Sequence, residues 1–141
     1  MRWTGPHGYW VSDDRSLIDV ATVHEWLSVQ SYWAQGRSYE LVARSLENSL
    51  TLGLYRPDGG QVGVCRWVTD YATFAWLCDV FVDATERGMG LGVFLVGTAM
   101  AHPDVEDLRL QVLGTRDAHE LYGRFGFVTV PAPERWMERR R

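Results

Sequence analysis

The residues best suited to chemistry in this 141-residue sequence form a glycine-rich segment at positions 87–92. The segment lies where an alternating, strand-like pattern gives way to a helical one. Its residues are Arg87, Gly88, Met89, Gly90, Leu91 and Gly92. Such a junction exposes backbone N–H groups at the positive end of a helix dipole, and glycines let an anion approach the main chain closely. The segment therefore predicts a site for a phosphate-bearing ligand, without identifying that ligand.

Two nucleotide-binding motifs do not fit this segment. A Walker loop needs a lysine, and all fourteen basic residues of the chain are arginines. The dinucleotide fingerprint G-x-G-x-x-G would require a third glycine where Val93 stands. A glycine turn that only packs a helix against a sheet remains the structural alternative.

Two segments in order resemble the GNAT N-acetyltransferases, in particular small bacterial members. Residues 87–92 resemble the family signature R/Q-x-x-G-x-G/A. Residues 115–127 resemble a second recurring pattern, N-x-x-A-x-x-L-Y-x-x-x-G-F, with Thr115 where asparagine is usual. That pattern is matched at Ala118, Leu121, Tyr122, Gly126 and Phe127. The resemblance extends from about residue 53 to residue 127, and the N-terminal third agrees only in the order of its elements.

The resemblance implies a GNAT fold: a single α/β (α+β) domain over residues 1–141, with about four helices flanking a mixed, mostly antiparallel sheet. It also implies acetyl-CoA as co-substrate and direct attack by a primary amine in a ternary complex. In the family, pantetheine enters between two splayed strands and the pyrophosphate lies on the glycine loop. The implied CoA-binding residues beyond that loop are Val80, Phe81, Val82, Thr115, His119 and Tyr122.

The proton-transfer groups are only partly identified. By resemblance, Tyr122 is the acid, since a phenol with a reference pKa of ~10 is protonated at neutral pH; a packing role is its alternative. Relatives often carry a glutamate base where this sequence has Trp76 or Cys78. Asp79 is the neighbouring carboxylate, but strand alternation directs it away from the Cys78 face unless a bulge intervenes. A buried structural role for Asp79, or a water relay, stays open.

Acceptor binding is expected in the aromatic segment between the first two helices. It contains Tyr32, Trp33 and Arg37, which suit a flat or carboxylate-bearing acceptor. His24 on the first helix belongs to the same predicted substrate-binding set, with a surface or capping role as its alternative. Core packing is the alternative for Trp33. The predicted acceptor is a small-molecule amine or an amine of a peptide or protein, and no metal is expected.

Capping residues and hydrophobic periodicity predict the elements that position these groups. Helices are expected after Asp19, Ser38 and Asp117 and after the glycine segment, and the second of them should bury Leu41 and Leu46. Strands are expected at residues 9–11, 49–55, 61–69, 73–82, 108–113, 127–130 and 135–138.

Composition limits the function classes further. The chain is 46% hydrophobic and 23% charged, as in ordinary globular proteins. A net charge of −4 argues against a nucleic-acid partner and is compatible with a cationic acceptor. No stretch suits a membrane span or a signal peptide, so a cytoplasmic monomer or homodimer is expected. Cys65 and Cys78 match no disulfide or zinc pattern. A non-catalytic module that senses acyl-CoA is the alternative function.

Overall fold

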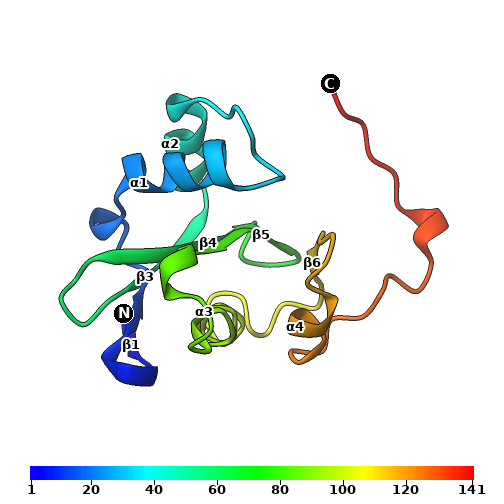
Figure 1. The fold of residues 1–141 in the computed structure, drawn as a ribbon. Coiled ribbons are helices and arrows are strands. Elements are labelled where there is room, and N and C mark those ends of the chain that lie inside the picture. The colour runs from blue at the N-terminus through cyan, green and yellow to red at the C-terminus, as the bar shows by residue number, and fades with distance from the viewer.

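The computed structural model describes residues 1–141 as a six-stranded sheet with helices on both faces (Figure 1). The first five strands form an antiparallel meander, and the sixth joins the edge in parallel, so the predicted mixed sheet is confirmed. The strands lie in chain order: β1 (Arg2–Thr4), β2 (Trp10–Ser12), β3 (Leu50–Tyr55), β4 (Gln61–Thr69), β5 (Ala75–Val82) and β6 (Gln111–Leu113). Strand β1 lies outside the segments predicted as strands.

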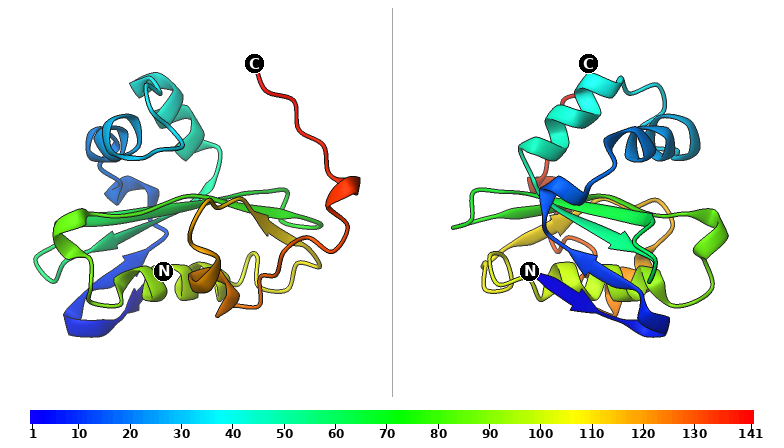
Figure 2. Two further views of the ribbon diagram at one scale, coloured as in Figure 1. Left: turned by 45° about the vertical axis from the view of Figure 1, so that its right-hand side comes forward. Right: turned by 90° about the vertical axis from the view of Figure 1, so that its left-hand side faces the viewer.

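Two helical layers enclose the sheet (Figure 2). Helix α1 (Val20–Glu25), its π-helical continuation Trp26–Gln30 and α2 (Tyr39–Glu47) cover one face, while α3 (Leu91–Met100) and α4 (His119–Gly123) cover the other. No helix is long and apolar enough to cross a bilayer.

The caps predicted for the first two helices are confirmed. The Asp19 carboxylate accepts a hydrogen bond from the Thr22 N–H, and the Ser38 hydroxyl accepts one from the Leu41 N–H, each at 3.1 Å. Both caps depend on residues three apart, so local sequence predicts them well. The prediction for Leu41 itself is wrong, because its side chain is 54% exposed.

The predicted Asp117 cap is also wrong. Helix α4 begins later, after Ala118, and the Ala118 N–H donates to the Thr115 hydroxyl at 3.0 Å. The Asp117 carboxylate instead pairs with the neighbouring Arg116 guanidinium at 3.0 Å on the surface. Thr115 therefore organises this turn.

The C-terminal segment departs from the predicted topology. No strand forms at residues 127–130 or 135–138, and β6 is shorter than the predicted strand 108–113. After α4 the chain runs away from the body and contains only a 3₁₀ turn, Pro133–Arg135 (Figures 1 and 2). Pro131 and Pro133 lack amide donors, and the apolar side chains of Val128 and Met137 are 78% and 97% exposed. The C-terminal segment has an alternating apolar pattern, but it has no neighbouring strand or helix to pack against and therefore forms no strand.

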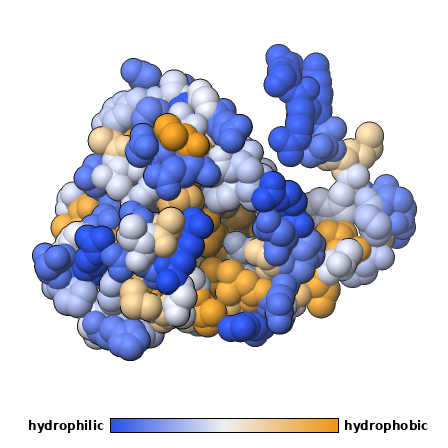
Figure 3. Space-filling view, in the orientation of Figure 1, coloured by the Kyte–Doolittle hydropathy of each residue, from blue (hydrophilic) through white to orange (hydrophobic).

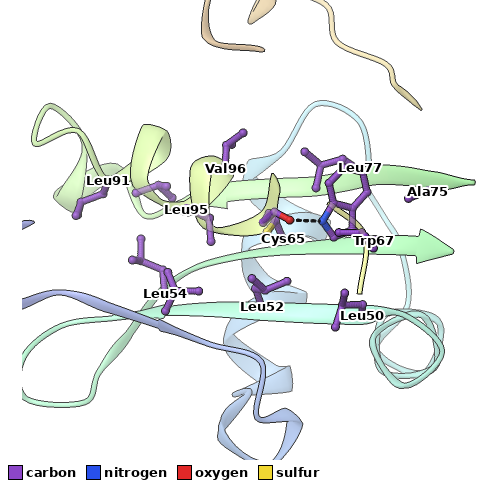
Figure 4. Packing of buried hydrophobic residues seen from close by; sticks show 14 of the residues in the cluster. Leu50, Leu52, Leu54, Cys65, Trp67, Ala75, Leu77, Leu91, Leu95 and Val96 are labelled. Carbon is purple, nitrogen blue, oxygen red and sulfur yellow. Dashed lines mark hydrogen bonds between the residues drawn. The ribbon is translucent and has the colours of Figure 1, made fainter. Parts of the chain in front are cut away.

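The sheet separates two hydrophobic cores. The larger one packs β3, β4 and β5 against α3, and the smaller one packs the other face against α1 and α2. Trp67 of β4 is fully buried in the larger core, and its indole N–H donates to the Ala99 carbonyl of α3 at 3.0 Å (Figure 4). This bond ties the end of α3 to the centre of the sheet.

Trp67→Phe is expected to lower the free energy of unfolding by about 2 kcal/mol, because it leaves a cavity and removes the shorter of two hydrogen bonds to the Ala99 carbonyl. Urea denaturation followed by far-UV circular dichroism measures the change. The matched control is Trp136→Phe in the exposed C-terminal segment, where a change below about 0.5 kcal/mol is expected. Equal effects of the two substitutions would contradict this description of the core.

Candidate active site

A cavity of about 820 Å³ opens between the segment at residues 31–37, the C-terminal half of β5 and the turn before α4. Its walls come from parts of the chain that are far apart in sequence, and both apolar and charged side chains line it. The space-filling view shows a hollow at the middle of this face with apolar atoms on its floor (Figure 3).

The last two strands, β5 and β6, separate at this cavity. Parallel pairing between β5 and β6 ends at Leu77 opposite Leu113, but β5 continues to Val82. Val80, Phe81 and Val82 therefore line the cavity with one edge of the strand unpaired by any neighbouring strand. This is the splay that the family resemblance implied, and its free backbone groups can pair with an extended ligand.

The glycine loop follows directly from this free strand edge. Gly88 and Gly90 have left-handed backbone conformations, with φ of 89° and 76°. A Cβ atom placed at either of them, or at Gly92, would meet no atom within 4 Å, so the approach to this stretch of main chain is open. Helix α3 has no side-chain cap, and its first backbone hydrogen bond runs from the Phe94 N–H to the Gly90 carbonyl. The N–H groups of residues 91–93 are therefore available to an anion.

The residue before the loop anchors it to the N-terminal hairpin. The Glu86 side chain is buried and accepts hydrogen bonds from the Tyr9 hydroxyl at 2.5 Å and from Arg56 Nε at 2.6 Å. Arg87 then turns back, and its Nε donates to the Val82 carbonyl at 3.0 Å. The start of the loop is thus held by the side chains of Glu86 and Arg87.

A β-bulge changes the direction of the side chains along β5. Arg66 of β4 lies opposite Cys78 and Val64 lies opposite Phe81, so one β4 residue faces two on β5. Asp79 is one of these two and has a φ of 53°. The bulge reverses the alternation beyond it: Leu77 packs in the core beneath α3, whereas Phe81 packs in the core beneath α1 and α2.

The bulge directs the Asp79 carboxylate toward three hydrogen-bond donors. It accepts hydrogen bonds from Arg66 Nε at 2.7 Å, from Arg37 Nη1 at 3.0 Å and from the Trp33 indole N–H at 2.9 Å. Burial alone would raise the pKa of Asp79, but the two guanidinium groups and the indole outweigh it and hold this pKa below its ordinary value. The carboxylate is therefore ionised and accepts hydrogen bonds from three side chains.

Tyr122 of α4 projects into the same cavity, and its hydroxyl has no hydrogen-bond partner in the protein. Its ring packs edge-on against Phe127. Burial, with a smaller contribution from Cys65, raises the pKa of Tyr122 to about 12. The phenol therefore keeps its proton at neutral pH, and its hydroxyl can donate a hydrogen bond into the cavity.

Tyr32 joins the two walls of the cavity. Its hydroxyl accepts a hydrogen bond from the Arg116 N–H at 3.1 Å, and the Arg116 guanidinium lies 3.7 Å from the centre of the Tyr32 ring. Contacts of this kind stabilise modestly at exposed positions. They connect the segment before α2 with the turn before α4.

The structure gathers most of the predicted site residues around this cavity. The lining includes Tyr32, Trp33, Arg37, Asp79, Val80, Phe81, Val82, Arg87, Gly92, Thr115 and Tyr122. Gly88, Met89, Gly90 and Leu91 lie outside the lining, and the Leu91 side chain is buried in the core.

The two predicted histidines lie away from the cavity surface. The His24 ring bonds through Nε2 to the Arg37 carbonyl at 3.0 Å, so it fixes the segment that carries Arg37. His119 is exposed and does not line the cavity. Sequence reasoning missed Arg66, although an arginine in the middle of an otherwise apolar strand is itself a sign of a buried partner.

Comparison with known proteins identifies the family. A family model described as an acetyltransferase (GNAT) domain matches residues 47–129. The chain belongs to the GNAT acetyltransferase family, which supports acetyl transfer as its class of reaction.

Individual relatives support the assignment to the GNAT acetyltransferase family. The chain is 44% identical to a candidate GNAT-family acetyltransferase of known structure from Xanthomonas campestris pv. campestris, with a TM-score of 0.91 over 96% of this chain and 94% of that one. A candidate acetyltransferase from Gibberella zeae is 28% identical over 82% of this chain and 76% of its own length. A Mycobacterium tuberculosis protein solved in complex with CoA shares the fold, with 19% identity and a TM-score of 0.68 over 85% of this chain and 72% of that one.

Asp79→Asn is expected to lower the free energy of unfolding by about 3 kcal/mol at pH 7, because it leaves two partly buried guanidinium groups without a counter-charge. The folded-state pKa of Asp79 is depressed, so its contribution is present above the unfolded pKa of about 3.9 and is lost as the pH falls through the folded value. Urea denaturation at pH 7 and below pH 4 should therefore show the gap between wild type and variant closing on acidification.

The matched control is Asp117→Asn, which removes an exposed ion pair and should cost less than about 0.5 kcal/mol at either pH. A gap for Asp79→Asn that stayed constant down to pH 3 would contradict the ionised cluster.

Proposed function

We propose that this chain transfers an acetyl group from acetyl-CoA to a primary amine. The observation that carries the proposal is the continuity of the cavity, which joins an unpaired strand edge and an unpartnered phenol and reaches both ends of the open glycine loop, at Arg87 and Gly92. Family membership supports the reaction class, and the CoA complex of the Mycobacterium tuberculosis neighbour supports the donor.

The residues present fit acetyl-CoA. The backbone groups of Val80, Phe81 and Val82 that face away from β4 would pair with the amide groups of the pantetheine arm, because this edge has no strand partner. The Val82 carbonyl is the exception, since it already accepts a hydrogen bond from Arg87 Nε. The free N–H groups at the start of α3 and the charge of Arg87 would hold the pyrophosphate. When bound, acetyl-CoA supplies an activated acetyl thioester.

Tyr122 supplies the proton that the departing sulfur needs. The amine nitrogen forms a bond to the acetyl carbon, the carbon–sulfur bond breaks, and the thiolate takes the phenolic proton. The amine gives up one proton to solvent, and solvent returns one proton to the Tyr122 phenolate. A phenol with a pKa of about 12 keeps its proton until negative charge develops beside it.

Cys78 also lines the cavity, but its environment does not favour a covalent intermediate. Burial raises the pKa of the Cys78 thiol to about 11, and the thiol donates to the Arg66 carbonyl at 3.7 Å. A protonated thiol is a weak nucleophile, and no histidine lines this cavity to activate it. This supports direct attack by the acceptor amine.

The base that deprotonates the amine is assigned to solvent in the cavity. Asp79 was the predicted carboxylate candidate, and a catalytic role for it stays a prediction. Its three side-chain donors and lowered pKa give it a weak affinity for a proton, which favours a positioning role instead.

Tyr122→Phe is expected to lower kcat at least about tenfold and to leave acetyl-CoA binding within about twofold, since only the transferable proton is removed. Thiol release from acetyl-CoA with an amine panel measures turnover, and calorimetric titration measures binding. Tyr71→Phe, at an exposed turn, is the matched control. An unchanged kcat would refute the acid role, whereas binding without turnover of any amine by the wild type would favour the sensing module.

Gly92→Val should abolish acetyl-CoA binding while leaving the fold intact. Gly92 is helical with open space around it, so a side chain fits the protein but projects where the anion must approach. The absence of thermal stabilisation by acetyl-CoA reports the loss. Gly123→Val on α4 adds the same atoms to another open glycine outside the cavity and should leave stabilisation unchanged. Normal stabilisation of Gly92→Val would refute the loop assignment.

A further inference from the structure

Two arginines beside Asp79 have donors that the protein does not use. Arg37 binds the carboxylate through Nη1 alone. Arg66 binds it through Nε and donates to the Ser49 hydroxyl through Nη1 at 3.0 Å. Arg37 Nε and Nη2 and Arg66 Nη2 therefore have no protein acceptor, although a guanidinium carries five N–H donors.

Both guanidinium groups are held rigidly and partly desolvated at the cavity wall. Their side chains are 21% and 13% exposed, and both line the cavity. The backbone of Arg37 is fixed as well, because its N–H donates to Ala34 and its carbonyl bonds to His24. A fixed cation with unused donors in a partly buried site favours an anionic ligand.

The charges around the cavity do not favour a cationic acceptor. Five arginines and two aspartates line it, and neither aspartate is free. Asp79 already accepts three side-chain donors, and the Asp117 carboxylate is paired with Arg116. A polyamine would bring a second ammonium group into a site with no unpaired carboxylate to receive it.

The phosphates of the donor do not account for these two arginines. The open amides that suit a pyrophosphate lie at the start of α3, next to Arg87. Asp79 precedes Val82 by three residues, a separation of up to about 10 Å along β5. Arg37 and Arg66 thus lie on the far side of the free strand edge from the glycine loop.

We infer that the acceptor is a small aminocarboxylate whose carboxylate binds Arg37 and Arg66 while its amine reaches the thioester. This inference rests on the proposed acetyl transfer. Asp79 positions both arginines and leaves a net positive charge at the wall, and Trp33, which shares that carboxylate, flanks the ligand with its ring. The planar forks of arginine match a carboxylate in geometry as well as charge.

The test uses amine pairs that differ only in the carboxylate. Glycine, alanine, phenylalanine, glutamate and 4-aminobutyrate are each compared with the matching carboxamide, with putrescine as a cationic amine. Thiol release from acetyl-CoA gives kcat/KM. At least one acid should exceed its amide about tenfold or more, because a hydrogen bond to a charged group contributes about that factor. The amide has the more easily deprotonated amine, so greater amine reactivity cannot produce this preference.

Variants of Arg37 test whether this arginine causes the preference for the acid over its carboxamide. Arg37→Gln should lower the acid-to-amide ratio about tenfold, and Arg37→Lys should lie between that variant and wild type. General damage to the fold would lower both rates and leave the ratio constant. Arg44→Gln, at an exposed arginine of α2 outside the cavity, should leave the ratio unchanged.

A binding measurement separates this inference from the proposed reaction. The N-acetyl derivatives of the same acids and amides are titrated calorimetrically into protein saturated with CoA. Tighter binding of the acids that is lost in Arg37→Gln supports the carboxylate site even if no amine is acetylated, in which case only the transfer reaction fails. Equal binding and equal turnover of acids and amides, or a preference for putrescine, overturns the carboxylate site while leaving acetyl transfer intact.

Discussion

The geometry of the site depends on one buried carboxylate. Asp79 lies in a bulge with a left-handed backbone, a strained conformation for a residue other than glycine. Its three donors come from β4 and from the segment before α2, so a single charge aligns three parts of the chain. The same bulge reverses the side-chain alternation of β5, which lets one strand serve both hydrophobic cores. We infer that the ion cluster holds the bulge in place.

The charge of the site is opposite to that of the whole protein. The chain carries a net charge of −4, yet arginines outnumber aspartates around the cavity. Several acidic residues are committed elsewhere: Asp19 caps α1, Asp70 closes a surface turn, and Glu86 anchors the glycine loop. Total charge therefore indicates solubility and long-range attraction, whereas ligand preference depends on which charges remain unpaired at the wall. The overall negative charge of the chain is compatible with a cationic acceptor, but the charges around the cavity do not favour one.

Local features of the sequence predicted the fold better than long-range ones. The caps at Asp19 and Ser38 and the bounds of β4 are properties of short segments, and the sequence sufficed for them. The prediction of C-terminal strands is wrong because a strand needs a pairing partner, which no local sequence pattern reveals. Asp79 illustrates the same limit within the site: its partners Arg66 and Arg37 are 13 and 42 residues away, and the bulge that brings them together follows from pairing with β4.

The two halves of the site differ in how much sequence can reveal about them. The donor half uses backbone groups, so glycines at fixed spacing are required and form a recognisable motif at residues 87–92. The acceptor half uses side chains from three separate elements, and its selectivity depends on the balance of guanidinium and carboxylate groups between them. Replacing one of these side chains would change that balance without altering the glycine motif. The motif identifies the family, while the Asp79 cluster carries the inference about the acceptor.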